Sequence, residues 1–410
     1  MPKIIPFRAF SFASKFKNEM EKLIAPPYDV ISGDGLKALR SRHDYNAVKL
    51  SLAADPSDPE RYQKMKTEFQ DWKQKGVFEQ NAEPAFYLIE EVFDVGSTSQ
   101  TRIGFVALME VSPLAEKKVL PHEFTLAGPK KDRLELLKTM GAELSQVFLC
   151  YRDSELILEK IYSELKSSIP FLSVPKVDHV ARKVWKVADA KKVQDLIGLL
   201  DAQSVLIADG HHRYETSIRF REDDGTDKSK YVQSYFTNLS SPGFSIQSIH
   251  RLFSLPEGIS SQGFLENLRN VIELKKVPQI APADLLAANK RGEIAFFLKL
   301  AQTGEVFLCS RKKASSEDAE IFFIQQEIFE KIFHWDVATT PHGVLKYEHE
   351  LPEFEKTLAK LKNGVGIFLP PTNLDLVMTR ALRGERMPQK STYFYPKIAS
   401  GLINYELGKI

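Results

Sequence analysis

Short, continuous apolar runs alternate along this chain with longer segments of helical spacing. Four such runs span residues 85–89, 104–108, 147–149 and 204–208. They have the length of buried strands, whereas in 59–75 the large apolar residues recur every three or four positions, as on one face of a helix. This alternation predicts a mixed fold, α/β with α+β character, in which helices cover buried strands.

The length of the chain and a change of pattern predict two domains. Its 410 residues exceed what one ordinary domain usually holds. After Ser-Ser-Pro-Gly at 240–243 the pattern becomes helix, strand, helix, hairpin, helix. We therefore expect an α/β domain at 1–243 and a smaller α+β domain at 244–410. The aromatic-rich tail from 387 should dock back onto the functional site of the first domain.

Charge and composition restrict the class of partner. Lys plus Arg number 56 and Asp plus Glu 54, a net charge of +2, so no broad basic surface is expected and nucleic acid is not an expected partner. Cys150 and Cys309 have apolar neighbours, as buried, reduced cysteines do. No window approaches the ~20 apolar residues of a membrane helix, and residues 1–16 lack a signal-peptide pattern. We expect a cytoplasmic protein without a membrane partner.

The segment with the clearest chemistry is 209–213, which reads Asp-Gly-His-His-Arg. It follows an apolar run and precedes a segment of helical spacing. Gly210 lets the backbone approach a ligand closely, and the first amides of a helix attract phosphate. Arg213 can add a bidentate clamp. We therefore predict phosphate binding by Gly210, His211, His212 and Arg213, with Asp209 as a catalytic or metal-binding carboxylate. The alternative is an ordinary strand–turn–helix with packed histidines.

Four further polar clusters lie on proline-rich or irregular segments, where sites are often built. They are Pro-Pro-Tyr-Asp at 26–29, Pro-His-Glu at 121–123, Lys-Lys-Asp-Arg at 130–133 and Met-Pro-Gln-Lys-Ser-Thr at 387–392. Asp29 and Glu123 are candidate bases or Mg²⁺ ligands, although Asp29 equally suits a turn cap. The residues that we expect to bind substrate are Arg133, Lys390, Ser391 and Thr392.

Three familiar motifs are absent from the sequence. Residues 122–123 do not begin a His-Glu-x-x-His zinc motif, because Leu126 stands where the second histidine would be. There is also no Walker A sequence and no Gly-x-Gly-x-x-Gly. A P-loop kinase and a dinucleotide oxidoreductase are therefore unsupported, and any nucleotide must be held in another way.

Together these segments resemble the bacterial and archaeal family called domain of unknown function 1015. The matching segments are 6–9, 25–30, 121–123, Asp132-Arg133, Trp185, 208–215 and 387–397. They span nearly the whole chain, although the name of the family states no activity.

The turn at 209–213 also resembles the phosphate-binding signature of the ParB/sulfiredoxin superfamily, in which a Gly-x-His-Arg-like turn holds nucleotide phosphates. That superfamily includes the free serine kinases, which move a phosphoryl group between a nucleotide and L-serine. The resemblance covers one turn with its flanking strand and helix, and it implies a ParB/sulfiredoxin-like nucleotide-binding core. The chain departs from the pattern in its greater length, and no residue here aligns with the catalytic glutamate of the kinases.

These observations lead to one main hypothesis and two alternatives. We expect a phosphotransferase or phosphohydrolase for a small metabolite, serine or O-phosphoserine, with ATP or ADP as co-substrate and Mg²⁺ as cofactor. Asp209, Glu123 and Asp29 are its expected catalytic residues, and Asp209 and Glu123 its metal ligands. The alternatives are a metal-dependent hydrolase with His122, His211 and His212 as ligands, and a nucleotide-sensing DNA-binding regulator without catalysis. A homodimer is a further alternative for the oligomeric state.

Overall fold

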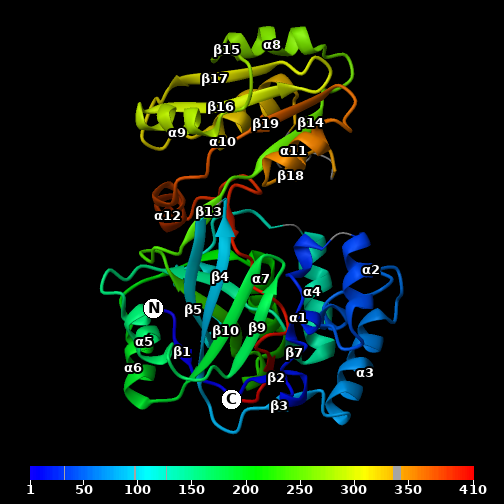
Figure 1. The fold of residues 1–410 in the computed structure, drawn as a ribbon, viewed down its shortest axis with the longest axis vertical. Coiled ribbons are helices and arrows are strands. Elements are labelled where there is room, and N and C mark those ends of the chain that lie inside the picture. Colours follow the sequence, from blue (N-terminus) through cyan, green and yellow to red (C-terminus); the bar gives the residue numbers. More distant parts are fainter. Residues whose placement is uncertain (32, 97, 126, 336–342) are drawn as a thin grey trace. The chain divides into compact units, whose positions relative to one another are not determined.

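The computed structural model describes residues 1–31, 33–96, 98–125, 127–335 and 343–410 (Figure 1). The chain forms two compact units. Unit 1 comprises Met1–Pro121, Thr125–Ser245 and Pro396–Ile410, and unit 2 comprises His122–Phe124 and Ile246–Tyr395. Our sequence-based boundary fell after residue 243 and kept 244–410 together. In the structure, Ser245 ends the long segment of unit 1, and the last residues of the chain return to that unit.

Unit 1 is built on a sheet of nine strands among the described residues. The order is β6-β11-β8-β12-β5-β4-β10-β9, with β1 added to β5. The strands are β1 (Ile4–Ile5), β4 (Phe86–Val95), β5 (Thr98–Glu110), β6 (Val119–Leu120), β8 (Val147–Tyr151), β9 (Leu172–Val177), β10 (Val180–Val187), β11 (Val205–Asp209) and β12 (Tyr231–Asn238). Strand β11 pairs parallel with β6 and antiparallel with β8, and β8 pairs parallel with β12, so the sheet is mixed.

Helices and short turns complete unit 1. Its described helices are α1 (Met20–Leu23), α2 (Gly33–Arg42), α3 (Arg61–Gln74), α4 (Ala127–Met140), α5 (Ile157–Leu165), α6 (Ala190–Gly198) and α7 (His211–Asp224). Smaller strands are β2 (Phe10–Phe12), β3 (Phe78–Gln80), β7 (Ala142–Glu143) and β21 (Tyr405–Glu406), and the 3₁₀ turns are η1 (Ser14–Phe16), η2 (Tyr28–Val30), η3 (Ala47–Leu50), η4 (Leu114–Glu116) and η5 (Asp227–Ser229). Figure 1 shows α5 and α6 at one side of the sheet and α2, α3 and α4 at the other.

Unit 2 contains a six-stranded sheet among its described residues, in the order β15-β17-β16-β19-β14-β18 and antiparallel throughout. Its strands are β14 (His250–Ser254), β15 (Glu273–Val277), β16 (Glu293–Leu300), β17 (Val306–Lys312), β18 (Lys346–Glu348) and β19 (Gly364–Phe368). Its described helices are α8 (Ser261–Arg269), α9 (Pro282–Lys290), α10 (Glu320–Phe323), α11 (Leu351–Leu358) and α12 (Leu374–Arg383). Two shorter strands, β13 (Ser245–Gln247) and β20 (Tyr393–Tyr395), pair with each other. The first residue of β13, Ser245, is the last residue of the unit 1 segment Thr125–Ser245.

Both faces of the unit 2 sheet are covered, which explains the continuous apolar run at 294–298. Phe296 and Leu298 lie in one buried cluster, while Ala295 and Phe297 lie in another. Successive side chains of a strand point to opposite faces, so a strand that is buried on both sides reads as unbroken apolar sequence.

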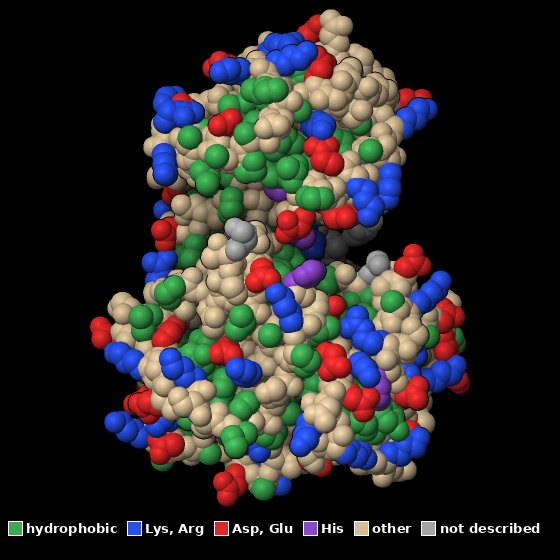
Figure 2. Space-filling model, in the orientation of Figure 1, with side chains coloured by type: hydrophobic (Ala, Val, Ile, Leu, Met, Phe, Trp, Pro, Cys, Tyr) green, Lys and Arg blue, Asp and Glu red, His purple; other side chains and the backbone are tan. Residues whose placement is uncertain are grey.

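The mixed α/β fold expected from the sequence is confirmed. Some boundaries differ. The last helix of the pattern expected after residue 243 is divided in the structure into α10 and a π-helical segment, Ile324–Ile332. Cys150 and Cys309 are buried and form no disulfide. Over the described residues, no helix combines the length and the apolar character that crossing a membrane requires. Figure 2 shows basic and acidic side chains interspersed on the visible face of each unit, in agreement with the small net charge of +2.

Candidate functional site

Gly210 forms the turn between β11 and α7. Its φ angle is 90°, in the left-handed region that glycine adopts without strain. A Cβ atom at this position would lie 3.0 Å from Nε of Arg213, because the guanidinium group folds back over the turn. The backbone conformation therefore favours glycine here, and a larger residue would also force the guanidinium group of Arg213 to shift.

Helix α7 begins directly after this glycine and has no side-chain cap at its first residue. The amide of Tyr214 donates the first intrahelical hydrogen bond, to the carbonyl of Gly210 at 2.9 Å. The amides at the preceding positions therefore point past the end of the helix, where they attract an anion. The helix is fixed by the buried Tyr214, whose hydroxyl donates to the carbonyl of Ser112 at 2.9 Å.

Two cations hold the carboxylate of Asp209, the last residue of β11. Nη2 of Arg213 lies 2.9 Å from Oδ2, and Nζ of Lys397 binds Oδ1. Burial alone would raise the pKa of Asp209, but the charges of Lys397 and Arg213 hold it well below its ordinary value. Nε of Arg213 is buried and has no hydrogen-bond partner among the described residues. Arg213 and Lys397 together thus carry one positive charge more than the carboxylate of Asp209 neutralises.

The loop at 26–29 contributes to the same region of unit 1. Tyr28 lies in η2, and the guanidinium carbon of Arg133 is 4.3 Å from the centre of its ring. Burial raises the pKa of the Tyr28 hydroxyl, while the charges of Arg213 and Arg133 lower it. The charges of Asp29 and Asp209 act in the opposite direction and raise this pKa. Asp29 itself is exposed.

Arg133 has further partners on α4 and just after η3. Its Nε donates to Oδ2 of Asp132 at 2.9 Å, and its Nη1 donates to the carbonyl of Ser51 at 2.8 Å. Asp132 in turn accepts a hydrogen bond of 2.6 Å from the hydroxyl of Tyr62. These contacts keep the guanidinium plane of Arg133 against Tyr28.

A cavity of about 70 Å³ in unit 1 is lined by both Arg133 and Arg213. Most of the other lining residues are apolar, and the third charged one is Glu143 of β7. Oε2 of Glu143 accepts the amide of Gln233 at 2.7 Å. Burial nevertheless raises the pKa of Glu143 to about 8, against the smaller effects of Gln233 and Arg213. Glu143 was not predicted as a site residue, because its only signal in the sequence is a lone acid between Ala142 and Leu144.

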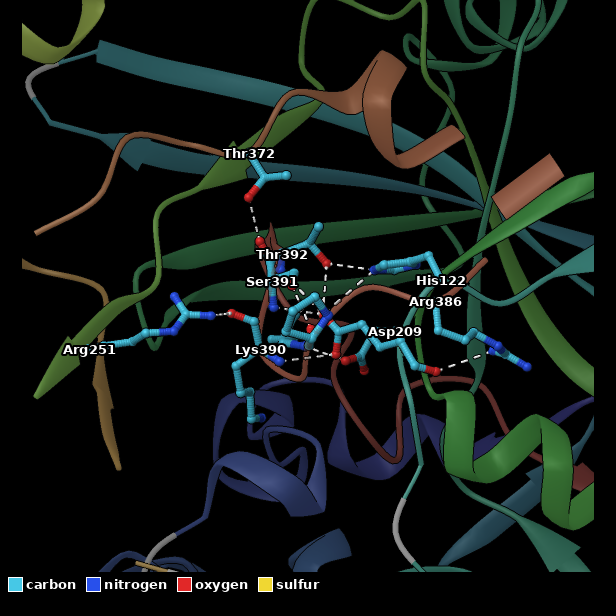
Figure 3. A network of polar contacts seen from close by, with 11 residues as sticks. His122, Asp209, Arg251, Thr372, Arg386, Lys390, Ser391 and Thr392 are labelled. Atoms are coloured by element: carbon cyan, nitrogen blue, oxygen red, sulfur yellow. Dashed lines mark hydrogen bonds and ion pairs between the residues drawn. The ribbon is translucent and has the colours of Figure 1, made fainter. Parts of the chain in front are cut away.

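Unit 2 holds the second group of expected site residues (Figure 3). Oε1 of Glu123 accepts the amides of Ser391 at 3.0 Å and Thr392 at 3.2 Å, and Oε2 accepts the amide of Lys390 at 3.3 Å. The Thr392 hydroxyl also shares a hydrogen bond of 2.8 Å with Nε2 of His122. Lys390 has a φ angle of 57°, as in backbone nests whose successive amides bind an anion. Glu123 therefore occupies the nest and fastens the segment at 390–392.

The structure thus sorts the expected site residues into two groups. Asp29, Arg133 and residues 209–213 lie in unit 1, whereas Glu123 and residues 390–392 lie in unit 2. Lys397 was not predicted as a site residue, although it ends the segment 387–397 that carries the family resemblance.

The metal-dependent hydrolase requires three histidines at one metal ion. His122 belongs to unit 2, while His211 and His212 belong to unit 1. Over the described part of the chain, no three His, Cys, Asp or Glu side chains come together in an arrangement that could hold a metal.

The fold and the site define a mixed α/β protein with a cationic strand–turn–helix site. More specifically, the chain belongs to the family described as "Protein of unknown function (DUF1015)", whose family model matches residues 4–330. No curated protein matches the chain.

Several solved structures are distantly similar to this chain. A free serine kinase variant in complex with ADP is 16% identical, with a TM-score of 0.41 over 74% of this chain and 91% of that chain. A conserved hypothetical protein from Pyrococcus furiosus is 16% identical, with a TM-score of 0.38 over 72% and 95%. SbnI with a C-terminal truncation, from Staphylococcus aureus, is 10% identical, with a TM-score of 0.37 over 72% and 85%. At such low TM-scores, no function follows from these likenesses.

Proposed function

We propose that unit 1 binds the phosphates of a nucleotide at residues 209–213. The observation that carries this proposal is the position of Arg213, whose guanidinium lies against Gly210 at the uncapped start of α7. Its buried Nε has no partner among the described residues, so it is a donor that a phosphate oxygen would satisfy. Lys397 adds a second positive charge at the same turn.

We further propose that the chain is a phosphotransferase or phosphohydrolase for a small metabolite, with serine or O-phosphoserine as the substrate and ATP or ADP as the nucleotide. Phosphoryl transfer depends mainly on positioning and charge neutralisation, which the cations around Asp209 supply. In this proposal Asp209 orients Arg213 and Lys397, and Asp29, which is exposed beside Tyr28, is the candidate base in unit 1.

Substrate recognition is assigned to Arg133 and to the segment at 390–392. Arg133 presents a guanidinium that is already oriented by Tyr28, which suits a carboxylate or phosphate of the substrate. Lys390, Ser391 and Thr392 offer an ammonium and two hydroxyls on a segment that Glu123 holds in place. To act as an acid or base, Glu123 would have to release the hydrogen bonds that its carboxylate accepts from these amides.

Asp209 and Glu123, the two expected magnesium ligands, are poorly placed to hold a Mg²⁺ ion by themselves. Both oxygens of Asp209 bind cations, and both oxygens of Glu123 accept backbone amides. Mg²⁺ often reaches such sites together with substrate phosphates, held by only one or two carboxylates. We therefore propose that Mg²⁺ enters on the nucleotide, and we assign no step to an ion bound by the protein alone.

Calorimetry with ADP and ATP in the presence of Mg²⁺ tests the nucleotide site. Arg213→Ala should weaken binding about ten- to hundredfold, because a charge-assisted contact contributes roughly 1.5–3 kcal/mol. Arg219→Ala is the matched control, since Arg219 lies on the same helix with its side chain 63% exposed and should leave affinity unchanged. Equal affinity in Arg213→Ala and the wild type, with both folded, would refute the assignment. Serine and O-phosphoserine, added with and without nucleotide, test the substrate.

A further inference from the structure

Unit 2 contains a larger cavity than the one beside Arg213. Its volume is about 250 Å³, and it lies between β14, the residues before α10 and the start of α12. Arg251 and Lys313 line it, together with hydroxyl and amide groups such as those of Thr372, Asn373 and Ser391. All of the lining residues belong to unit 2. No pattern in the sequence distinguishes Arg251 from the other arginines.

Arg251 is a buried cation whose hydrogen bonds go to neutral groups. It lies on β14 and is 3% exposed. Nη1 donates to the carbonyl of Ile249 at 3.2 Å, and Nη2 donates to the carbonyl of Lys390 at 3.3 Å (Figure 3). Among the described residues, no carboxylate forms a direct ion pair with it, although Tyr347, whose ring centre lies 5.8 Å from the guanidinium carbon, and Glu123 favour its charge. A buried charge without an ionic partner is costly, so its presence on a cavity wall indicates a ligand of opposite charge.

The second cation of the cavity, Lys313, also faces a neutral partner. Its Nζ donates to Oδ1 of Asn289 at 3.1 Å. Burial lowers the pKa of Arg251 to about 10, so its guanidinium stays charged at neutral pH.

The acidic residues of the cavity wall are largely matched by other groups. Glu317 pairs with Arg383 at 2.6 Å, and Asp318 pairs with Arg311 at 3.0 Å. Burial raises the pKa of Glu320, which favours its neutral form. Asp375, in the first turn of α12, is the remaining acid. Most of this negative charge is therefore already compensated, whereas Arg251 forms no direct ion pair with a described carboxylate and is influenced only by the charges of Tyr347 and Glu123.

We propose that this cavity binds a small organic anion whose carboxylate or phosphate group pairs with Arg251. A guanidinium presents parallel donors to two oxygens of such a group. The volume exceeds that of a single inorganic ion, and the hydroxyl and amide groups of the wall suit a short polar body. The start of α12, a ten-residue helix capped by Asn373, adds a favourable dipole at the same wall. The residues that line this cavity all belong to unit 2, and they include Ser391, to which we also assign substrate recognition. The proposal does not rest on nucleotide binding at the turn 209–213 of unit 1.

The test is calorimetric titration of the full chain with inorganic phosphate and, separately, with malonate. Each titration is carried out in an Arg213→Ala background, so that binding at the turn in unit 1 does not contribute. If only phosphate binds, the ligand carries a phosphate group, and if only malonate binds, it carries a carboxylate. If both bind, the site recognises the anionic oxygens that the two groups share. Binding of neither probe overturns the proposal.

The variants locate the site within unit 2. Arg251→Met should lower the affinity at least tenfold, and Lys313→Ala should lower it less. Lys312→Ala is the matched control, because Lys312 is the neighbouring residue with a side chain 74% exposed and does not line the cavity. Thr379→Phe places a larger side chain at the wall of the cavity on α12, and it should also weaken binding, which keeps the proposal testable if Arg251→Met does not fold. Unchanged affinity in Thr379→Phe and in the folded Arg251 variant overturns the proposal.

Discussion

Lys397 binds the carboxylate of Asp209 although the two residues are 188 positions apart in the sequence. Both side chains are largely buried within unit 1. The last segment of the chain therefore supplies one of the two cations that neutralise the end of β11. Arg213, four residues after Asp209, supplies the other.

Replacing Lys397 by methionine should make the protein less stable at neutral pH. One cation, Arg213, would remain beside Asp209, so the loss should fall below the roughly 3–5 kcal/mol seen when a buried pair is broken outright. The pKa of Asp209 lies below its ordinary value of 3.8 in the folded protein, so its contribution to stability is present above that pH and is lost as the pH falls. Lys397→Met raises this pKa, and the loss in acid should become smaller.

Urea denaturation at pH 7 and pH 3 measures this difference. Lys409→Met is the control, because Lys409 also lies in the last segment but is half exposed and pairs with Glu406. Equal stability of Lys397→Met and the wild type at pH 7 would show that the ion pair contributes nothing.

Local signals in the sequence were sufficient to place the turn but not its partners. An apolar run that ends at Asp209-Gly210 predicts a strand followed by a turn, and the structure has β11 and Gly210 there. Helix α7 begins at His211 and not at residue 213, because the first turn of a helix carries no apolar periodicity. Lys397 and Glu143 reach the site through contacts between distant segments, which periodicity and spacing do not encode.

The buried charges of the unit 1 sheet illustrate the same limit. Glu91 on β4 accepts hydrogen bonds from Nε of Arg102 at 2.9 Å and from Nε of Arg182 at 3.2 Å. These three residues stand opposite one another on adjacent strands. Each looks like an exposed residue of an alternating strand until the neighbouring strands are known.

Glu91→Gln should strongly destabilise the protein. The substitution leaves two buried arginines without their shared carboxylate, and removing one partner of a buried ion pair typically costs about 3–5 kcal/mol. Lys183→Gln on β10 is the control, since its side chain is 54% exposed and its loss should change stability by no more than about 0.5 kcal/mol. Chemical denaturation of both variants measures the difference, and similar small losses would contradict a structural role for Glu91.

Lys390→Ala and Glu123→Ala should have different effects. Lys390→Ala removes an exposed ammonium but keeps the backbone amide, so the melting temperature should hardly change. The affinity for phosphoserine, nucleotide or anions should nevertheless fall. Glu123→Ala removes the acceptor of three amides and should lower the melting temperature. Thermal denaturation and ligand titration of both variants provide the comparison. If Lys390→Ala binds phosphoserine, nucleotide and anions normally, Lys390 is not a substrate-binding residue.

Glu143 should make the stability of unit 1 fall as the pH rises through the neutral range. Its pKa is raised from 4.5 to about 8 in the folded protein, so between these values the folded state keeps a proton that the unfolded state has lost. Stability from this group is therefore fully present below pH 4.5, and it decreases by up to about 1.4 kcal/mol per pH unit until the folded pKa is passed. Glu143→Gln removes the titrating group while keeping the shape of the side chain. The free energy of unfolding of this variant, measured by denaturation between pH 5 and pH 8, should therefore depend less on pH than that of the wild type. Parallel pH profiles of the two proteins would mean that Glu143 is already ionised in the folded state, and that the cavity beside Arg213 admits water.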